Sequence, residues 1–319
     1  MPTTIAALNR PTSNDPAARW RQFADWAKRR RWALTIADRL GRGRGRVRFL
    51  DALHEPVRPR RLDLRPLLDA QLGVAMIGHA TTLLRVGGRT ILTDPVFSNR
   101  IGISAGWMTL GPRRRLAPAI SIDRLPPLDL ILLTHAHFDH LDRPTLARLP
   151  RTGPVIAASD NRDLIDDLGF SQVIELKWGR SLSIGDLAIH AVPCQHWSPR
   201  VFMDDHRGYN AYLIKSARHR VLFGGDTALH DGFADHAPID LMLVGIGAYD
   251  PFIYAHANPE QAYEMARQAR ARHVAPMHHS VFKLSVEPMH EPLDRFLAAA
   301  RADGPVVVAP RVGDVWIDP

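Results

Sequence analysis

The chain has 319 residues, of which 45% are apolar and 23% are charged, as is usual for globular proteins. Its single cysteine, Cys194, excludes an intramolecular disulfide, and its longest apolar runs are too short to span a bilayer. The N-terminus shows no basic start followed by an apolar core and a cleavage site. These features predict a cytoplasmic protein made of one large α/β domain, residues 62–319, and an N-terminal arm, residues 1–61.

The predicted arm is strongly basic. Residues 19–61 contain 14 Lys or Arg and four Asp or Glu, a balance of +10, so the net charge of +8 leaves −2 for the rest of the chain. Three of the seven tryptophans lie in the same stretch. We expect a partly helical arm that either docks on its own domain or makes peripheral contact with an anionic membrane surface. Nucleic acid is the partner that we favour least, because the remaining domain carries no basic stripe.

Short β-rich segments with tight turns begin at residue 72. The expected strands are Val74–Ile77, Thr82–Val86 and Thr90–Thr93, with a Gly87-Gly88 turn between the last two. His79 and Asp94 follow strand ends, from which side chains can reach a site and orient metal ligands, although Asp94 alternatively caps its own turn. Residues 98–120 form a long irregular stretch around Trp107 that mixes apolar and basic groups, as an amphiphilic, anionic substrate would require.

The stretch LDLILLTHAHFDHLD, residues 128–142, carries the strongest functional signal. Its apolar run, Leu130–Leu133, has the length and branching of a strand buried on both faces and ends at Thr134. Four potential metal ligands follow within six residues: His135, His137, Asp139 and His140. Because this set contains no thiolate, it suits zinc, manganese or iron. Its spacing hinders all four from binding one ion, so we expect two ions that each take a pair.

The rest of the domain alternates strands with helices, the pattern of an α/β fold. We expect helices at residues 143–149, 161–168 and from Asn258 onward, and strands at 155–158, 173–176, 182–184, 187–192, 219–223, 241–248 and 273–277. Asn258, followed by Pro259 and Gln261, has the sequence of a helix N-terminus. His256 precedes this cap, where it can face the same site. Three strands end next to further candidate ligands: His196, Asp226 and either His278 or His279.

Four strands thus bring seven candidate ligands to one edge of the fold. Three ligands for each of two ions, with the Asp226 carboxylate shared between them, would leave positions for water. Positions open to water are typical of a catalytic metal site, whereas a structural site is closed.

Seven motifs occur in a fixed order between residues 72 and 285: GHAT, TDP, THAHFDH, QHWSPR, GGDT, HANPE and MHHSVF. Together they resemble the metallo-β-lactamase superfamily, and within it the branch that contains N-acylphosphatidylethanolamine-hydrolysing phospholipase D and the ascorbate-phosphate lactonases. The resemblance implies a four-layer αβ/βα sandwich with two divalent metal ions at one edge of the paired sheets, zinc first and manganese or iron as alternatives.

The resemblance also implies a role for each candidate ligand. One ion would be held by His135, His137 and His196, the other by Asp139, His140 and His278, and Asp226 would bridge them. The family usually reads His-Trp-Gly-Thr-Phe where this chain reads His-His-Ser-Val-Phe at residues 278–282. The first of these histidines therefore takes the ligand position, and His279 lies beside it in a supporting role.

The activity that we expect is hydrolysis of a lipid-like or other small phosphodiester. Two cations that share a water lower its pKa towards neutrality and stabilise the charge that builds on the substrate, so a metal-bridging hydroxide is the expected nucleophile. Asp139 is the candidate for orienting this hydroxide, and His256 for binding the developing oxyanion or protonating the leaving group. Hydrolysis of a lactone or another carboxylic ester is the alternative reaction. The alternative to an enzyme is a metal-stabilised module that binds nucleic acid or membrane.

Overall fold

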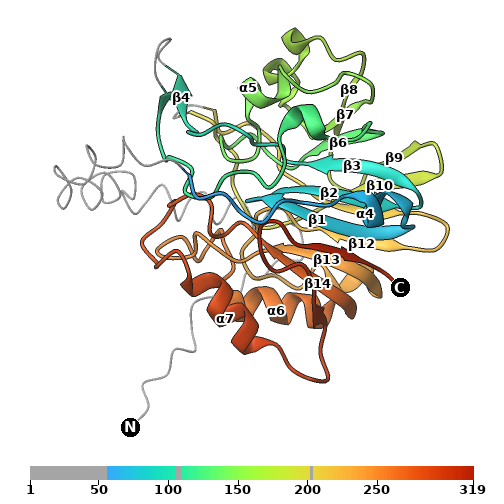
Figure 1. The fold of residues 1–319 in the computed structure, drawn as a ribbon, viewed down its shortest axis with the longest axis vertical. Helices are drawn as coiled ribbons and strands as arrows, with labels where there is room; N and C mark the ends of the chain where they lie inside the picture. Colours follow the sequence, from blue (N-terminus) through green and yellow to red (C-terminus); the bar gives the residue numbers. More distant parts are fainter. Residues whose placement is uncertain (1–55, 105–108, 202–203) are drawn as a thin grey trace. The chain divides into compact units, whose positions relative to one another are not determined.

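The fold is that of a computed structural model, which describes residues 56–104, 109–201 and 204–319 (Figure 1). Most of the predicted basic arm, and Trp107 of the irregular stretch, lie outside the described residues. Residues 56–319 form one compact unit. The beginning of this unit is tied to the domain, since the backbone of Val57 exchanges hydrogen bonds with Arg115 and Ala117.

Within the described residues, two mixed β-sheets of seven strands each form the centre of the unit (Figure 1). The strand order in the first sheet is β16 (Val315–Ile317), β1 (Leu72–Gly78), β2 (Thr81–Val86), β3 (Arg89–Thr93), β6 (Leu130–Leu133), β7 (Val155–Ala158) and β8 (Val173–Leu176). In the second it is β15 (Val306–Val307), β14 (Ala271–Met277), β13 (Ile239–Gly245), β12 (Arg220–Phe223), β11 (Ala211–Lys215), β10 (Leu187–Val192) and β9 (Ser181–Ile184). A short hairpin, β4 (Ile103–Ser104) and β5 (Thr109–Leu110), belongs to neither sheet.

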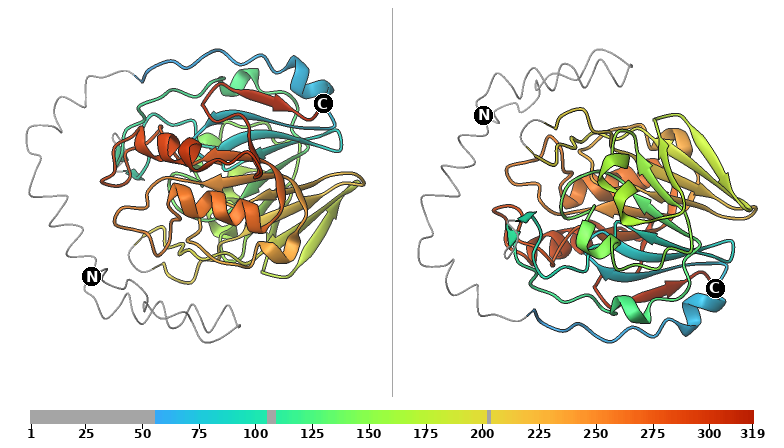
Figure 2. Two further views of the ribbon diagram at one scale, coloured as in Figure 1. Left: turned by 90° about the horizontal axis from the view of Figure 1, so that it is seen from below. Right: turned by 90° about the horizontal axis from the view of Figure 1, so that it is seen from above.

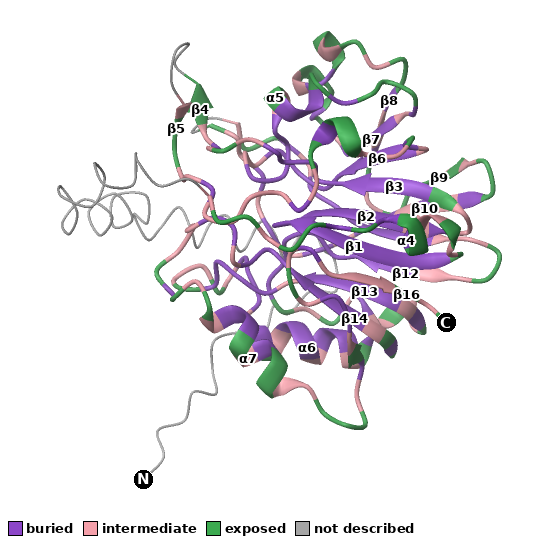
Figure 3. Ribbon diagram, in the orientation of Figure 1, coloured by how far each residue is buried: buried purple, intermediate pink, exposed green. Residues whose placement is uncertain are grey.

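The two sheets pack face to face, and helices cover their outer faces. The core between the sheets includes Met76 and Leu132 from the first sheet and Phe223 and Leu243 from the second. The central strands of both sheets are buried, whereas the edge strands β9, β15 and β16 are half-buried or exposed (Figure 3). The second sheet is covered by α6 (Pro259–Gln268) and α7 (Glu291–Ala299) (Figure 2). The first is covered by α4 (Arg65–Asp69), α5 (Arg143–Leu146) and the 3-10 turns η1 (Ile122–Arg124), η2 (Arg162–Leu164) and η3 (Asp166–Leu168). The predicted four-layer sandwich is confirmed.

Both sheets contain four parallel strands, and these strands position the site. In the first sheet β3, β6, β7 and β8 are parallel, and in the second β12, β13, β14 and β15 are parallel. Their buried apolar residues end abruptly at polar ones, so that Asp94 follows β3, His135 follows Thr134 at the end of β6, Asp226 follows β12 and His278 follows β14. Because parallel strands end at the same edge of a sheet, these side chains are delivered together.

The predicted hairpin of residues 82–93 is confirmed. Strands β2 and β3 are antiparallel, and Val86 pairs with Arg89 across the two-residue turn. Gly87 and Gly88 have φ of 58° and 77°, the left-handed region that this tight turn requires and that glycine adopts at little cost.

The predicted helix at residues 161–168 is wrong, because that segment forms the two 3-10 turns η2 and η3. The backbone N–H of Asn161 donates to Glu175, and its side-chain amide donates to the carbonyls of Ala158 and Gly208. These tertiary hydrogen bonds compete with a continuous helix. The predicted helix at 143–149 ends at Leu146, and the buried strand β11 and the helix α7 were not predicted.

Among the described residues, no helix is both long enough and apolar enough to cross a bilayer.

The capping box predicted at Asn258 is present and should contribute measurably to stability. The Asn258 side chain accepts from the backbone N–H of Gln261, and the Gln261 side chain accepts from the backbone N–H of Asn258. We expect Asn258→Ala to lower the free energy of unfolding by about 1 kcal/mol, because it leaves a helix N-terminal N–H without a partner. Urea denaturation measures this change. Asn258→Asp, which keeps the acceptor, is the control, and equal stability of both variants with the original chain would contradict the assignment.

Candidate metal centre

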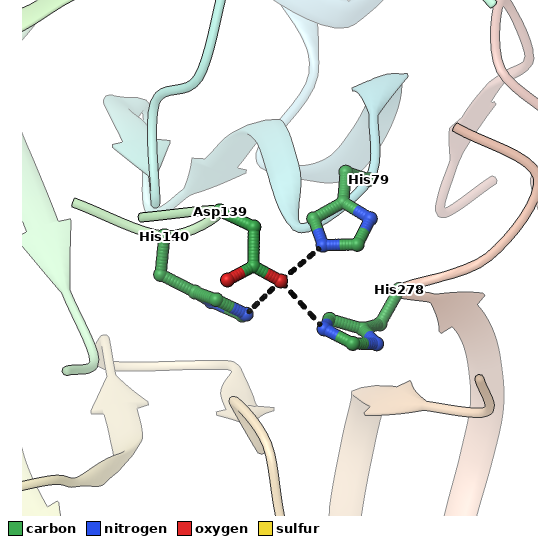
Figure 4. A group of neighbouring side chains, drawn as sticks. All are labelled: His79, Asp139, His140 and His278. Atoms are coloured by element: carbon green, nitrogen blue, oxygen red, sulfur yellow. Dashed lines mark hydrogen bonds and ion pairs between the residues drawn. The ribbon is translucent and has the colours of Figure 1, made fainter. Parts of the chain in front are cut away.

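The seven candidate ligands come together at one edge of the two sheets. They belong to four segments: the loop after β6, the segment after β10, the turn after β12 and the end of β14. Figure 4 shows the part of the cluster around Asp139. The donor atoms fall into overlapping groups whose members all lie within 4.8 Å of one another: His135, His137 and His196; Asp139, His140 and His278 together with His79; His135, His140 and Asp226; and His196, Asp226 and His256.

The first group consists of three imidazoles. His137 Nδ1 lies 2.9 Å from His135 Nε2 and 3.3 Å from His196 Nε2. Three nitrogens bound tetrahedrally to a zinc ion at about 2.0–2.1 Å are separated by about 3.3 Å, so the observed spacing fits a divalent cation. The orientation of His196 is fixed from behind, because its Nδ1 lies 3.0 Å from the carbonyl oxygen of Ala255 and donates to it. Its Nε2 lone pair therefore faces the group.

The second group surrounds the carboxylate of Asp139 (Figure 4). Asp139 Oδ2 lies 3.1 Å from His278 Nε2 and 3.6 Å from His140 Nε2. It also lies 2.9 Å from His79 Nε2. This contact is the one that a residue orienting the ligand Asp139 would make, and the supporting role of His79 stays a prediction.

Asp226 lies between the two groups. Its Oδ2 is 3.0 Å from His278 Nε2 and 3.1 Å from His140 Nε2 on one side. On the other side the same oxygen is 3.9 Å from both His135 Nε2 and His196 Nε2. Asp226 Oδ1 is buried and has no hydrogen-bond partner among the described residues. A buried carboxylate oxygen without a partner costs free energy unless a cation or water satisfies it, so this geometry fits a carboxylate that bridges two cations.

The electrostatics of the cluster also fit cation binding. Burial lowers the pKa of His137 to about 4 and that of His196 to about 3, so both imidazoles are neutral at neutral pH and available as ligands. Burial acts to raise the pKa of Asp226, but the facing charges of His140 and His278 outweigh it and hold that pKa well below its usual range. In return, Asp226 and Asp139 overcome the effect of burial and raise the pKa of His278 to about 9. Without metal, protons on His140 and His278 thus balance the negative charge of Asp226 and Asp139. Bound cations can balance the same charge instead.

A hydrogen-bonded pair, Asp94 and Thr134, holds ligands of both groups from behind. The Thr134 hydroxyl lies 2.6 Å from Asp94 Oδ2 and 2.9 Å from His135 Nδ1. The same Asp94 oxygen lies 2.7 Å from His140 Nδ1. A hydroxyl has one proton, and because Thr134 donates it to the carboxylate, its oxygen accepts from His135. Both rings are therefore protonated on Nδ1 and turn Nε2 towards the cluster.

This arrangement favours the orienting role for Asp94 over the alternative of a turn cap. The sequence pattern predicted that the strand ends at Thr134, but not that the Thr134 hydroxyl orients a ligand. The position of Thr134 at the point where the apolar strand ends and the histidines begin is the signal that could have identified this role.

Several residues around the site have backbone conformations that residues other than glycine rarely adopt. His79, Asp94 and His278 have φ of 60°, 32° and 61°, in the left-handed region. We call residues 134–142, between β6 and α5, the motif loop. Gly225 has φ of 58°, and a Cβ there would lie 2.9 Å from Thr134 Cγ2, so only glycine lets the Asp226 turn approach the motif loop this closely.

The QHWSPR segment anchors the motif loop, an interaction that the sequence did not predict. The Arg200 guanidinium donates to the carbonyls of Ala136 and Leu141 and lies 4.1 Å from the centre of the Phe138 ring. The Ser198 hydroxyl accepts from the N–H of Ala136. Both ends of the loop are thus fixed to the segment that supplies His196.

Two further predicted residues lie at different distances from the donors. His256 Nδ1 is 3.8 Å from Asp226 Oδ2, and its ring lies next to those of His196 and His278. His279 points elsewhere: its Nδ1 lies 2.8 Å from the Ser280 hydroxyl, and it belongs to none of the donor groups found among the described residues.

The fold and the His/Asp cluster define a metal-dependent hydrolase of the metallo-β-lactamase fold. The chain belongs to the β-lactamase superfamily, since the family described as Beta-lactamase superfamily domain matches residues 89–279.

The chain is 33% identical over 264 residues to an uncharacterized protein of Mycobacterium tuberculosis, a match that covers 78% of this chain and 69% of that protein. It is 29% identical over 279 residues to N-acyl-phosphatidylethanolamine-hydrolyzing phospholipase D 1 of Caenorhabditis elegans, covering 78% and 76% of the two chains. Its fold is similar to the crystal structure of a possible metal-dependent hydrolase from Veillonella parvula, with a TM-score of 0.62, 16% identity and coverage of 77% and 99%.

The contact between Thr134, Asp94 and His135 predicts that the Thr134 hydroxyl controls metal affinity. We expect Thr134→Val, which keeps the shape but removes the hydroxyl, to weaken zinc binding about 10- to 100-fold, because His135 loses the acceptor that fixes its ring. Thr134→Ser should restore most of the affinity. Titration of the apoprotein with zinc against a competing chelator measures both. Tight binding by the valine variant, or equally weak binding by both variants, would contradict the assignment.

Proposed function

We propose that this hydrolase is a dinuclear, metal-dependent phosphodiesterase of the N-acylphosphatidylethanolamine phospholipase D type. The observation that carries the proposal is the position of Asp226 Oδ2 between two groups of imidazoles. The named phospholipase D of Caenorhabditis elegans supports a lipid-like phosphodiester as the substrate.

In this proposal His135, His137 and His196 would hold one divalent ion, Asp139, His140 and His278 would hold the second, and Asp226 would contact both. Zinc is the first choice, because nitrogen and carboxylate donors without thiolate suit it, and manganese or iron are the alternatives. The ions would supply Lewis acidity and would make a hydroxide available at neutral pH. The protein's own contribution is to fix the donors, orient water and substrate, and handle the proton of the leaving group.

Asp139 is the residue that we assign to orienting the attacking water. Its carboxylate is held from one side by the His79 ring, whose Nε2 lies 2.9 Å from Oδ2. A carboxylate held in this way has few alternative orientations, so a water that donates a hydrogen bond to it is held in one position.

His256 is the residue that we assign to the leaving oxygen. It is buried beside Asp226, and burial lowers the pKa of its ring to about 3, so the neutral imidazole is the form present at neutral pH. A neutral imidazole N–H can donate a hydrogen bond to the oxygen on which charge develops, and the departing alkoxide then takes its proton from water.

The cytoplasmic location and the peripheral membrane contact of the basic arm stay predictions, since residues 1–55 lie outside the described part of the chain.

The proposed reaction predicts turnover of phosphodiesters by the metal-loaded protein. We expect hydrolysis of bis-p-nitrophenyl phosphate and of N-acylphosphatidylethanolamine. Release of nitrophenol measures the first reaction, and separation of the lipid products measures the second. A panel of lactones is the comparison, because the same site can attack a carbonyl group. Hydrolysis of lactones with no turnover of either phosphodiester would replace this proposal with the ester-hydrolase alternative.

The bridging role of Asp226 predicts the metal content. Elemental analysis should find two divalent ions per chain in the original protein and fewer in Asp226→Ala, with loss of phosphodiester hydrolysis, because both donor groups lose a ligand. Asp166→Asn, at an exposed ion pair with Arg162, is the matched control and should retain both ions. Two ions per chain in Asp226→Ala would show that this carboxylate bridges nothing.

The role of His256 predicts a fall in rate without loss of metal. His256→Gln should lower kcat for phosphodiesters about 10²- to 10⁴-fold and make the rate depend more steeply on the pKa of the leaving alcohol, because the donor to the leaving oxygen is gone. The control is His206→Gln, on an exposed histidine. If His256→Gln lost bound metal, or kept the original dependence on the leaving group, His256 would have another role.

A further inference from the structure

Three aromatic side chains form a half-buried surface at one side of the metal centre. Trp197 directly follows the ligand His196, while Phe252 and Tyr254 lie in the loop between β13 and α6. The Trp197 ring stacks on His196 with centroids 5.1 Å apart and on Tyr254 at 5.7 Å, with interplanar angles of 24° and 21°. The Phe252 ring lies 6.2 Å from Trp197. We call these three residues the aromatic shelf.

The shelf is continuous with one donor group and not with the other. The centroid of Trp197 lies 5.7 Å from that of His137 and 6.0 Å from that of His256. His137 is also the one half-buried member of the seven candidate ligands. The side of the cluster that carries the shelf therefore also carries the most exposed of the candidate ligands.

Packing alone does not account for the shelf. Its three rings belong to none of the four hydrophobic cores formed by the described residues. Ile253, between two of them in sequence, is 43% exposed. Apolar rings held half-open beside a reactive centre are typical of a surface that binds the apolar part of a ligand.

We propose that the aromatic shelf binds an apolar substituent on the leaving oxygen of the substrate. The inference rests on the proposed function, because it uses the assignment of His256 to that oxygen. With the phosphoryl group at the ligands and the leaving oxygen next to His256, the group attached to that oxygen extends over Trp197 and Tyr254. The selected substrates are then phosphodiesters whose departing alcohol carries an alkyl, acyl or aryl group.

A quaternary ammonium group is the other ligand that aromatic rings attract. The site argues against it in two ways. Trp197 and Tyr254 are nearly parallel to each other and form a surface instead of a cage around a cation. A positive headgroup on the shelf would also lie about 6 Å from the donors of the metal centre, and two divalent cations bound there would repel it.

Binding of three phosphate monoesters to the metal-loaded protein tests the shelf without turnover: methyl phosphate, octyl phosphate and phosphocholine. Calorimetry should give at least a tenfold lower Kd for octyl than for methyl phosphate, because each fully buried methylene is worth about fourfold in affinity and the shelf covers one side of the chain. Phosphocholine should bind no better than methyl phosphate. Equal affinity for octyl and methyl phosphate, or preference for phosphocholine, would overturn the proposal.

Variants of the shelf residues test whether the preference for octyl phosphate arises at the shelf. Trp197→Ala and Tyr254→Ala should each remove most of the preference for octyl phosphate, while Trp197→Phe should keep part of it. Trp316→Phe, on β16 in contact with His273, is the control at a distance from the shelf. Metal content is measured for each variant, so that a loss of ligands is not mistaken for a loss of the shelf. Retention of the full preference in both alanine variants would also overturn the proposal.

The binding test of the aromatic shelf can succeed or fail independently of the proposed phosphodiesterase reaction. If the original protein hydrolyses no phosphodiester, the reaction is wrong, yet the difference between octyl and methyl phosphate still decides whether the shelf binds apolar groups. If it does hydrolyse them, Trp197→Ala should raise KM for bis-p-nitrophenyl phosphate more than it lowers kcat, because the shelf binds ground state and transition state alike.

Discussion

The buried carboxylate of Asp226 is the interaction on which the rest of the site depends. It faces imidazoles from four other segments, and one of its oxygens has no hydrogen-bond partner among the described residues. Removing a carboxylate and several imidazoles from water costs free energy that a well-packed apolar core would not cost. The fold holds these groups together nonetheless, which is understandable if cations complete the arrangement and supply the function.

Rigid support makes this concentration of polar groups possible. Six of the seven candidate ligands follow the ends of parallel strands, and His196 follows the antiparallel strand β10. The side chains of these strands form the core between the two sheets, so packing fixes the backbone behind the ligands. Thr134 and Asp94 then fix the rings of two ligands, one from each donor group, and Arg200 fixes both ends of the motif loop. Left-handed backbone at His79 and His278 is tolerated because this surrounding structure determines it.

The amino-acid pattern predicts which candidate ligands come together at one edge of the fold, but not which residues surround them. A buried apolar strand that ends in polar residues is a local signal, so it places His135, Asp226 and His278 at one edge of the fold. The anchoring of the motif loop by Arg200 carries no such signal, because it joins residues 59 and 64 positions apart. The 3-10 turns at residues 162–168 were mistaken for a helix, since the bonds that oppose the helix come from Glu175 and Gly208.

The two sides of the centre differ, and the difference gives the substrate a direction. One donor group contains the half-buried His137 and adjoins the aromatic shelf, whereas the other contains Asp139 and the buried His79. We propose that Asp226 joins these two sides through two bound ions, and anomalous X-ray diffraction from crystals of the metal-loaded protein can locate those ions. We expect two anomalous peaks, one on each side of Asp226 Oδ2. A single peak, or a pair of peaks out of contact with Asp226, would show that Asp226 does not bridge two ions.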